Sequence, residues 1–424
     1  MPQKAHSHAD PWDRLQWFLG FDWAKDEHDV VVLDPRGRIV LRRTVPNTAE
    51  GWDGLREALH DLAGDDLAVV GVAIETSRGP DVDRILDLGC TVYPVHPVVS
   101  KRLRERKAPP GVKDNELDAW ALGDGLRTDG HAWRRLRPDS DPTRTLRMLC
   151  RDEVALIEQR TALVNQLRAA LREYYPAALE AFTEWTMPAA WSFLTRFPTP
   201  AKLARAGKRA WEKFLHTHRL ARPQTYEGRL EIFARAEAFC GHPAVIEAKS
   251  VLAVAIAKQL QCLDKQLKGY RSEIEKLYHE HQDHGIYSSL PAMGPTLGPR
   301  ILVEIGDDRS RFPDAASVQC YGGSAPVSFQ SGQMRRVRFR RACNKHLRYA
   351  LHLWVQESRR KCVWAGVYYH SKRDQGMTHA CALRCLAQRW LKIIWKMWQT
   401  RRPYDEALHT RNQVQHGSWL LALT

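Results

Sequence analysis

The sequence predicts an α/β domain at the N-terminus, an all-α coiled-coil insertion in the middle, and a mostly helical C-terminal domain. Short apolar runs between turn signals occupy the first part of the chain, and two long apolar seams with steps of three and four residues occupy the middle. At 424 residues the chain exceeds one typical hydrophobic core, which favours two or three domains. The expected boundaries are 15–130, 143–285 and 286–400, followed by a tail over 401–424.

The first domain should be built from short strands and helices. Apolar and β-branched runs bounded by turn signals predict strands at 17–22, 30–33, 38–45, 67–74 and 91–93. Helical spacing of apolar residues predicts helices over 48–62 and 81–88. The run 67–74 is too apolar for a surface strand, so we expect a central strand covered on both faces. Three strands followed by alternating helix and strand is the order of a ribonuclease-H-like domain.

Acidic residues stand at the ends of two of these strands. Asp22 closes the first strand, and Glu75 directly follows the central one. In a ribonuclease-H-like sheet these two strands are neighbours, so both carboxylates should meet at one edge. Paired carboxylates repel each other unless cations separate them, and hard divalent cations take carboxylate oxygens as ligands. We therefore expect a divalent metal site at this edge.

Further metal ligands should come from the segment Lys113-Asp114-Asn115-Glu116-Leu117-Asp118, which opens a helix. Residues three or four apart share one face of a helix. Asp114 and Asn115 could therefore both point with Asp118 toward the metal. An acidic residue taken alone is more often a solvated surface charge, so it is the position at strand ends that favours a functional role for the first two acids.

A polar linker is expected at 128–142, followed by two helical seams. These seams run through Leu149, Leu156, Leu163, Leu167, Leu171 and Tyr174, and through Ile256, Leu260, Leu263, Leu267, Tyr270, Ile274 and Leu277. Their spacing is typical of a coiled coil. The seams can pair as an antiparallel hairpin within one chain or form a contact between two chains, and the pattern does not distinguish these arrangements.

The C-terminal domain combines glycine turns with a dense basic run. Residues 290–298 resemble a helix-hairpin-helix turn, whose glycines let backbone N–H groups approach a phosphate. A serine on a glycine turn, Gln330-Ser331-Gly332, precedes the basic residues Arg335, Arg336, Arg338, Arg340, Arg341, Lys345 and Arg348. Val337 and Phe339 alternate with the arginines, which predicts a strand with one basic face suited to backbone phosphates.

Ser331 is a candidate nucleophile. A serine hydroxyl is a poor nucleophile at neutral pH unless a base or a cation activates it. Metals held by the N-terminal acids could supply that activation or stabilise the leaving oxygen, and nearby arginines would offset charge in the transition state. Together these features indicate phosphoryl transfer on nucleic acid.

The charge of the chain supports a polyanionic partner. Its net charge is +15 and its pI is about 9.5, and neutralising phosphates releases counterions that drive binding. A soluble protein that is basic for other reasons would have the same net charge.

No apolar run approaches the ~20 residues that span a bilayer, and the polar start lacks the apolar core of a signal peptide, so we expect a cytoplasmic, nucleoid-associated protein. Nine cysteines without a CxxC pair predict neither a disulfide framework nor a strong zinc site.

The order and separation of these motifs resemble an insertion-sequence transposase of the "one-ten" family. That family combines a RuvC-like DEDD domain with a C-terminal serine-bearing transposase domain and is related to the pilin-gene invertase. The resemblance covers nearly the whole chain and is weakest in the helical middle. The matching segments are Gly20–Asp26, Ala73–Gly79, Gly111–Ala119, Leu126–Gly130 and the stretch from Met293 through Gly332.

The resemblance implies a mechanism and partners. Four family metal positions carry over as Asp22, Glu75, Asn115 and Asp118, which would bind Mg²⁺ or Mn²⁺, and Ser331 would attack DNA and form a covalent phosphoserine link. The implied activity is transposition or recombination between element ends and target DNA, guided by a structured noncoding RNA. Protomers would assemble as a dimer or tetramer, so that one RuvC-like domain faces the serine domain of another protomer.

One position departs from the family pattern. The family motif Lys-(Ser/Thr)-Asp-x-x-Asp has asparagine, Asn115, at a metal position here. An asparagine carbonyl can still bind a hard cation, but one negative charge is lost unless Asp114 substitutes. Two other functions therefore stay open. One is a metal-dependent, structure-specific nuclease such as a junction resolvase, with water as nucleophile, and the other is a degenerate copy that binds nucleic acid without cutting it.

Overall fold

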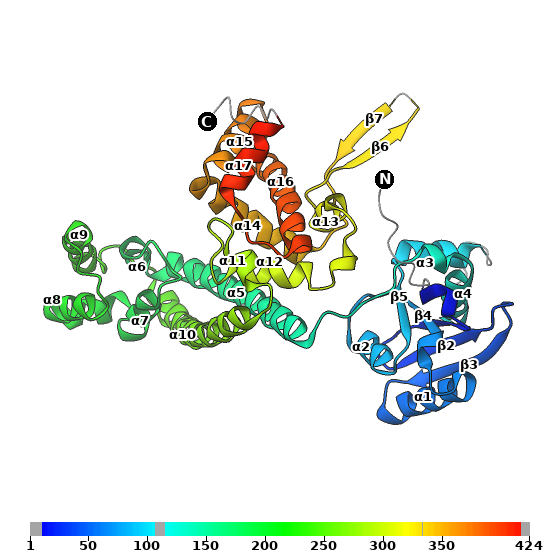
Figure 1. The fold of residues 1–424 in the computed structure, drawn as a ribbon. Helices are drawn as coiled ribbons and strands as arrows, with labels where there is room; N and C mark the ends of the chain where they lie inside the picture. The colour runs from blue at the N-terminus through cyan, green and yellow to red at the C-terminus, as the bar shows by residue number, and fades with distance from the viewer. Residues whose placement is uncertain (1–10, 107–114, 333, 417–424) are drawn as a thin grey trace. The chain divides into compact units, whose positions relative to one another are not determined.

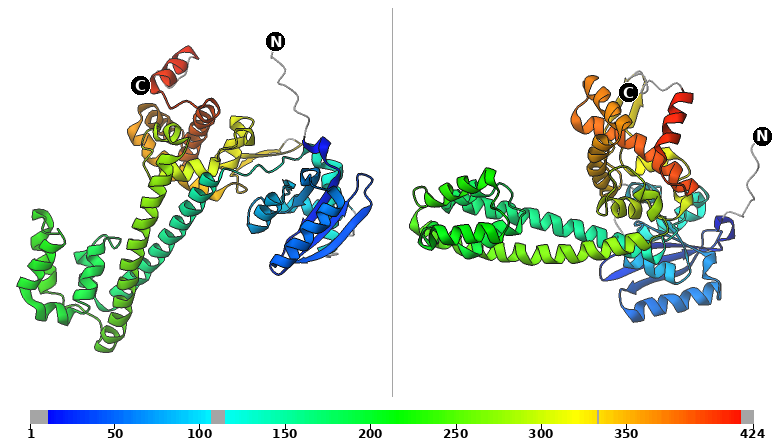
Figure 2. Two further views of the ribbon diagram at one scale, coloured as in Figure 1. Left: turned by 60° about the horizontal axis from the view of Figure 1, so that its bottom comes forward. Right: turned by 60° about the vertical axis from the view of Figure 1, so that its left-hand side comes forward.

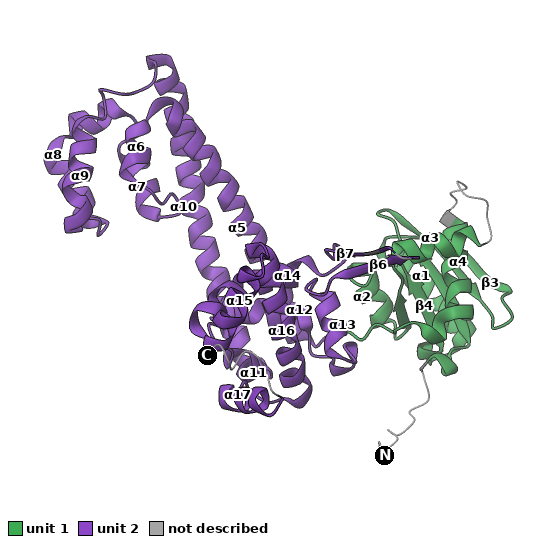
Figure 3. Ribbon diagram, turned by 90° about the horizontal axis from the view of Figure 1, so that it is seen from above, with its two compact units in different colours: residues 1–138 green, residues 139–424 purple. Residues whose placement is uncertain are grey.

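The structure, a computed structural model, divides the chain into two units, residues 1–138 and 139–424 (Figure 3). It describes residues 11–106, 115–332 and 334–416. The first unit is a mixed α/β sheet domain, and the second is mostly helical (Figure 1). The predicted succession of an α/β part and a helical part is confirmed, whereas the division of the second unit into a coiled-coil region and a serine domain stays a prediction.

A five-stranded sheet with the strand order β3-β2-β1-β4-β5 forms the centre of the first unit. The strands are β1 (Trp17–Asp22), β2 (Glu27–Leu33), β3 (Ile39–Pro46), β4 (Val70–Ile74) and β5 (Thr91–Pro94). Strand β1 is antiparallel to β2 and parallel to β4, which is also parallel to β5. The predicted strand 67–74 begins three residues before the observed strand β4. These three residues form a 3-10 turn, η2 (Leu67–Val69), because the Asp66 side chain accepts a hydrogen bond from the Ala68 N–H.

Both faces of the sheet are covered, as predicted for its central strand. Leu19 and Phe21 of β1 pack with the apolar side chains of α1 and α2, and Phe18, which alternates with them, packs with α4. The helices of this unit are η1 (Pro11–Arg14), α1 (Ala49–Ala63), α2 (Pro80–Asp87), α3 (Pro97–Glu105), α4 (Asn115–Asp129) and η3 (Gly130–Ala132). Helix α3 is absent from the sequence prediction. The linker predicted at 128–142 is shorter than expected, because α4 and η3 occupy its first residues.

Two long antiparallel helices, α5 (Asp141–Tyr174) and α10 (Pro243–Glu280), pack along one another in the second unit (Figure 2). Their direction follows from two ion pairs, Glu153 with Arg271 and Glu173 with Lys249. The two predicted seams therefore pair with each other within one chain. Around an aromatic core at one end of this pair lie α6 (Pro176–Ala181), α7 (Pro188–Arg196), α8 (Pro200–Thr217) and α9 (Pro223–Ala234).

The other end of the helix pair carries the C-terminal helices and a β-hairpin (Figure 1). The helices are α11 (His284–Ser288), α12 (Leu297–Ile305), η4 (Arg309–Arg311), α13 (Ala315–Tyr321), α14 (Lys345–Lys361), α15 (Val363–Asp374), α16 (His379–Thr400) and α17 (Glu406–Gln415). The hairpin consists of β6 (Val327–Ser331) and β7 (Met334–Arg338). Trp354, Trp390 and Trp398 are fully buried in the core of these helices. None of the helices in the described part of the chain is long and apolar enough to cross a bilayer.

Gly298, which the sequence analysis assigns to a phosphate-binding turn, has a packing role. A Cβ atom at this position would overlap the Tyr278 hydroxyl of α10. Helix α12 is buried from Gly298 to its end at Ile305, so it needs this close approach to α10. Helix packing therefore requires this glycine, and the approach of the turn to a phosphate stays a prediction.

Candidate active site

Asp22 and Glu75 lie at the same edge of the sheet. In the parallel pair β1 and β4, Phe21 is in register with Ile74; Asp22 is the last residue of β1, and Glu75 directly follows β4. Both acids are half-buried. Two carboxylates from segments far apart in the sequence are thus brought to neighbouring strand ends, as the element order predicts.

Helix α4 reaches this edge because glycine lets it lie directly on β1. A Cβ atom on Gly20 would overlap the Ala119 carbonyl oxygen and would lie 2.6 Å from the Gly123 nitrogen. A Cβ atom on Gly123 would in turn lie 3.0 Å from the Phe18 carbonyl oxygen. The close contact holds the first turn of α4, which carries Asp118, against the half of β1 that ends in Asp22.

Replacing Gly20 with alanine should therefore destabilise the first unit by about 3 kcal/mol, because overpacking against backbone atoms cannot be relieved by a side-chain rotation. Urea denaturation of the full-length protein would measure this change. Gly269→Ala in α10 is the matched control, since a Cβ atom there meets nothing within 4 Å and alanine favours a helix. Equal stability of the two variants would contradict the close packing of α4 on β1.

Arg104 of α3 is the cation of this site. Its Nη1 atom donates to both carboxylate oxygens of Asp118, at 2.7 and 2.8 Å, and the Asp118 side chain is only 13% exposed. The hydrogen bond to Asp118 raises the pKa of Arg104 against the opposing effect of burial, and the charges of Asp118, Glu105 and Glu75 add to the rise. The guanidinium group therefore lies within electrostatic reach of two of the candidate metal ligands.

Arg104 is not among the site residues that the sequence predicts. The available signal is the basic segment Lys101-Arg102-Leu103-Arg104, which lies between the last strand and the acidic motif. This segment has the composition of a solvated helix face, and only the fold brings one of its four side chains to the carboxylates.

The carboxylates at this edge are hard oxygen donors of the kind that Mg²⁺ and Mn²⁺ take, so the donor set fits the implied metal. Within the described residues, no three His, Cys, Asp or Glu side chains lie close enough together to hold a metal ion, and the positive charge beside Asp118 is that of Arg104. Asn115 is the first residue of α4. Lys113 and Asp114 lie outside the described residues, so the choice between Asp114 and Asn115 as a ligand stays open.

Ser331 lies in the second unit, at the end of the hairpin. It is the last residue of β6 and is in register with Met334, and Gly332 between them adopts a positive φ of 54° that glycine accepts readily. The serine is exposed. Among the described residues no side chain forms a hydrogen bond with its hydroxyl.

The basic run is divided between the hairpin and the residues C-terminal to it. Arg336 and Arg338 alternate along β7, with Arg338 over the Phe329 ring, and the register places Arg335 opposite Gln330. Arg340 and Arg341 come after the strand, and Arg340 donates to the Ala325 carbonyl oxygen at the hairpin base. Lys345 and Arg348 belong to α14. Val337 is 62% exposed, so the strand has no buried face and the basic side is one of two open sides.

Comparisons with known proteins assign the chain to a family. A family described as a transposase, the DEDD transposase of IS110, matches residues 19–176, and the "Transposase IS116/IS110/IS902 family" matches residues 285–370. The chain is 35% identical over 401 residues to the "Mini-circle putative transposase for IS117" of Streptomyces coelicolor, which covers 93% of this chain and 96% of the relative. The chain belongs to the IS110 family of transposases.

Two further relatives of this IS110-family protein are similar over the same length. The chain is 29% identical to the 44.8 kDa protein of insertion element IS116 from Streptomyces clavuligerus, covering 93% of this chain and 97% of the relative. It is 25% identical to the 43.6 kDa protein of insertion element IS110 from Streptomyces coelicolor, covering 92% and 96%. The family resemblance inferred from the motifs is therefore confirmed. The matched segment 19–176 contains the acidic edge and Arg104, and 285–370 contains Ser331 and the basic run.

Proposed function

We propose that this IS110-family transposase cuts and joins DNA by metal-dependent phosphoryl transfer, with Ser331 as the nucleophile. The observation that carries the proposal is the meeting of Asp22 and Glu75 at the ends of parallel strands, with Asp118 on a helix packed directly against one of them. The strand order β3-β2-β1-β4-β5 supports a RuvC-like, ribonuclease-H-like fold for this unit. Membership of a transposase family supports DNA as the substrate.

Asp22, Glu75 and Asp118, together with Asp114 or Asn115, would hold Mg²⁺ or Mn²⁺. A bound metal supplies Lewis-acid stabilisation of phosphoryl oxygens at such a site. Arg104 holds the Asp118 carboxylate in place by its two hydrogen bonds and balances its charge. A cation that binds Asp118 therefore competes with this ion pair.

Ser331 then attacks a backbone phosphorus. The bond from the serine oxygen to phosphorus forms, the bond from phosphorus to one strand oxygen breaks, and the serine proton passes to a base. The leaving oxygen takes up a proton from water, so the released strand ends in a free hydroxyl. Arg336 and Arg338 lie on the same strand pair and would bind the neighbouring phosphates. Because Ser331 and the acidic edge belong to different units, we further propose that a dimer or tetramer combines them between protomers, and that a noncoding RNA guides the choice of target.

A covalent adduct tests this proposal. Full-length protein is incubated with labelled DNA carrying an element end, with Mg²⁺ or with EDTA, and protein-bound DNA is detected after denaturation. The wild-type protein should form a phosphoserine adduct that needs the metal, and Ser331→Ala should form none while still binding DNA. Ser328→Ala is the matched control, since Ser328 is also exposed on β6. An undiminished adduct in the Ser331→Ala protein would refute the assignment of the nucleophile.

A metal-dependent nuclease with water as nucleophile is the second candidate. It is favoured by the Ser331 hydroxyl, which has no hydrogen-bonding side chain among the described residues, because the acidic edge could act on water without it. In the same assay this function predicts that wild-type and Ser331→Ala proteins both cleave DNA without an adduct. A degenerate copy that only binds nucleic acid predicts neither adduct nor cleavage.

A further inference from the structure

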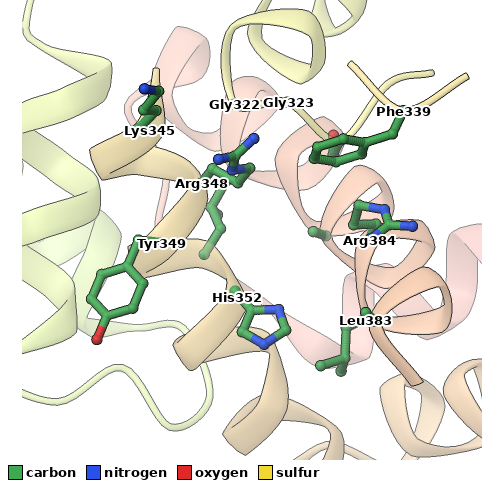
Figure 4. A pocket seen from close by; sticks show the side chains of 13 residues that line it. Gly322, Gly323, Phe339, Lys345, Arg348, Tyr349, His352, Leu383 and Arg384 are labelled. Carbon is green, nitrogen blue, oxygen red and sulfur yellow. The ribbon is translucent and has the colours of Figure 1, made fainter. Parts of the chain in front are cut away.

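A pocket of about 290 Å³ opens between α14 and α16 at the base of the hairpin (Figure 4). Residues three, four and seven apart share one face of a helix, so α14 contributes Arg348 and His352 to one wall. Helix α16 contributes Leu383 and Arg384 to the opposite wall, and Phe339, which directly follows β7, lies at the outer edge. In the sequence Arg348 belongs only to a basic series, and it is the fold that brings these side chains together.

The pocket is positively charged. Lys345, Arg348 and Arg384 line it, and its lining contains no acidic residue. In the part of the chain that the structure describes, none of the three forms an ion pair with a carboxylate; Arg348 donates instead to the Cys343 sulfur atom at 3.4 Å. Gly323 makes room for this contact, because a Cβ atom there would lie 2.7 Å from that sulfur. Cations without a carboxylate partner favour the binding of a phosphate.

An aromatic ring lies among these cations. The guanidinium carbon atoms of Arg348 and Arg384 lie 5.3 and 4.9 Å from the centre of the Phe339 ring, and the side chain is still 45% exposed. Exposed aromatic faces and guanidinium planes stack on unpaired nucleobases. A nucleotide could therefore cover the exposed Phe339 ring with its base while its phosphate contacts the cations.

One histidine, His352, lines the pocket beside apolar side chains such as Leu351 and Leu383. Burial lowers the pKa of His352, and the nearby charges of His379 and Arg384 lower it further, so the imidazole is neutral at pH 7. A neutral imidazole offers one donor and one acceptor nitrogen. These two nitrogens suit hydrogen bonding to the edge of a base better than they suit a second phosphate.

We propose that this pocket binds one unpaired deoxynucleotide of the DNA strand held by the hairpin, with its base on Phe339 and its phosphate on Lys345, Arg348 and Arg384. The proposal rests on the proposed action on DNA, since strand exchange unpairs bases next to the cut. A volume of about 290 Å³ lies just below the range of about 300–1,000 Å³ typical of small-molecule pockets, so it suits one nucleotide at most and excludes a duplex.

Fluorescence anisotropy with two labelled DNA probes tests the pocket. One probe is a fork with a short single-stranded end, and the other is a blunt duplex with the same paired sequence. Both are bound to full-length Ser331→Ala protein so that cleavage does not intervene. Adding Phe339→Ala should weaken binding of the fork about tenfold, as loss of a stacking side chain does for single strands, and should leave the duplex unchanged. Phe339→Tyr, which keeps the ring, should bind the fork normally.

The cationic part of the pocket has its own control. Arg384→Gln should weaken fork binding, whereas Arg389→Gln, an equal loss of charge at an exposed position of the same helix, should not. Unchanged fork binding in Phe339→Ala, or an equal loss with both probes, would overturn the pocket and leave the proposed function intact. An RNA fork of the same sequence serves as a third probe. If Phe339→Ala weakened the binding of the RNA fork but not of the DNA fork, DNA would be the wrong occupant. If the parent protein bound neither DNA probe, the pocket and the proposed action on DNA would both be refuted.

Discussion

Asp22→Asn should lower the rate of DNA cleavage by about a thousandfold. The substitution keeps the size of the side chain but removes one negative charge from the acidic edge. A metal ion at a phosphoryl-transfer site supplies several kcal/mol of transition-state stabilisation, and each ~1.4 kcal/mol is a factor of ten in rate. Single-turnover cleavage of labelled DNA at saturating Mg²⁺ measures the effect.

A neighbouring acid provides the control for this variant. Asp29 of β2 is in register with Asp22, and its carboxylate accepts a hydrogen bond from the Thr44 hydroxyl at 2.8 Å. Asp29→Asn therefore removes an equal charge from the residue paired with Asp22 while every candidate ligand is kept, and cleavage should fall far less than in Asp22→Asn. Equal losses in the two variants would indicate a general electrostatic effect, and no loss in Asp22→Asn would exclude this edge as the catalytic site.

Glu153→Ala should destabilise the second unit by about 3–5 kcal/mol, the cost of breaking a buried ion pair. The Glu153 side chain is 1% exposed and accepts hydrogen bonds from Arg271 at 2.9 Å and from Arg300 at 2.7 Å. Arg300 lies on buried helix α12 and is itself only 8% exposed, so the variant would leave its charge buried without this partner. Urea denaturation of the full-length protein would measure the loss.

Two further variants separate the ion pair from other effects. Glu158→Ala removes an exposed acid from the same helix and should be nearly neutral. Replacing both partners, in Glu153→Ala/Arg300→Met, should recover much of the lost stability, because no unpaired charge is then left inside. If the double variant lost as much stability as Glu153→Ala and Arg300→Met lose together when measured singly, packing rather than the buried charge would explain the loss.

The same region connects the long helices to the hairpin and the pocket. Glu304 of α12 accepts two hydrogen bonds from Arg151 of α5, at 2.7 and 2.8 Å, and one from Asn344 at 2.6 Å. Asn344 in turn caps α14 through the Leu347 N–H. Burial opposes ionisation of Glu304, but these partners outweigh it and lower its pKa, so the carboxylate stays charged at neutral pH. The position of α14, and with it the pocket, therefore depends on this buried network.

Much of the first unit could be predicted because its signals are local. The apolar runs of β1 and β4 and the acid at each strand end can be recognised from consecutive residues. The turn before β3 and the Thr48 cap of α1 also depend on near neighbours. By contrast, α3 is short and largely polar, so its pattern resembles a solvated segment, and the partner of Arg104 lies 14 residues further along the chain.

The family, the acidic strand ends Asp22 and Glu75, and the glycine turn that carries Ser331 beside a basic run can all be inferred from the amino-acid sequence alone. Three other features become visible only in the folded chain: the two seams pair within one chain, Gly20 lets α4 lie on β1, and Arg104 pairs with Asp118. The pocket around Phe339 belongs to this second group as well. Strand, helix and turn preferences depend on residues close in sequence, whereas an ion pair, a close backbone approach or a cavity exists only where distant segments meet.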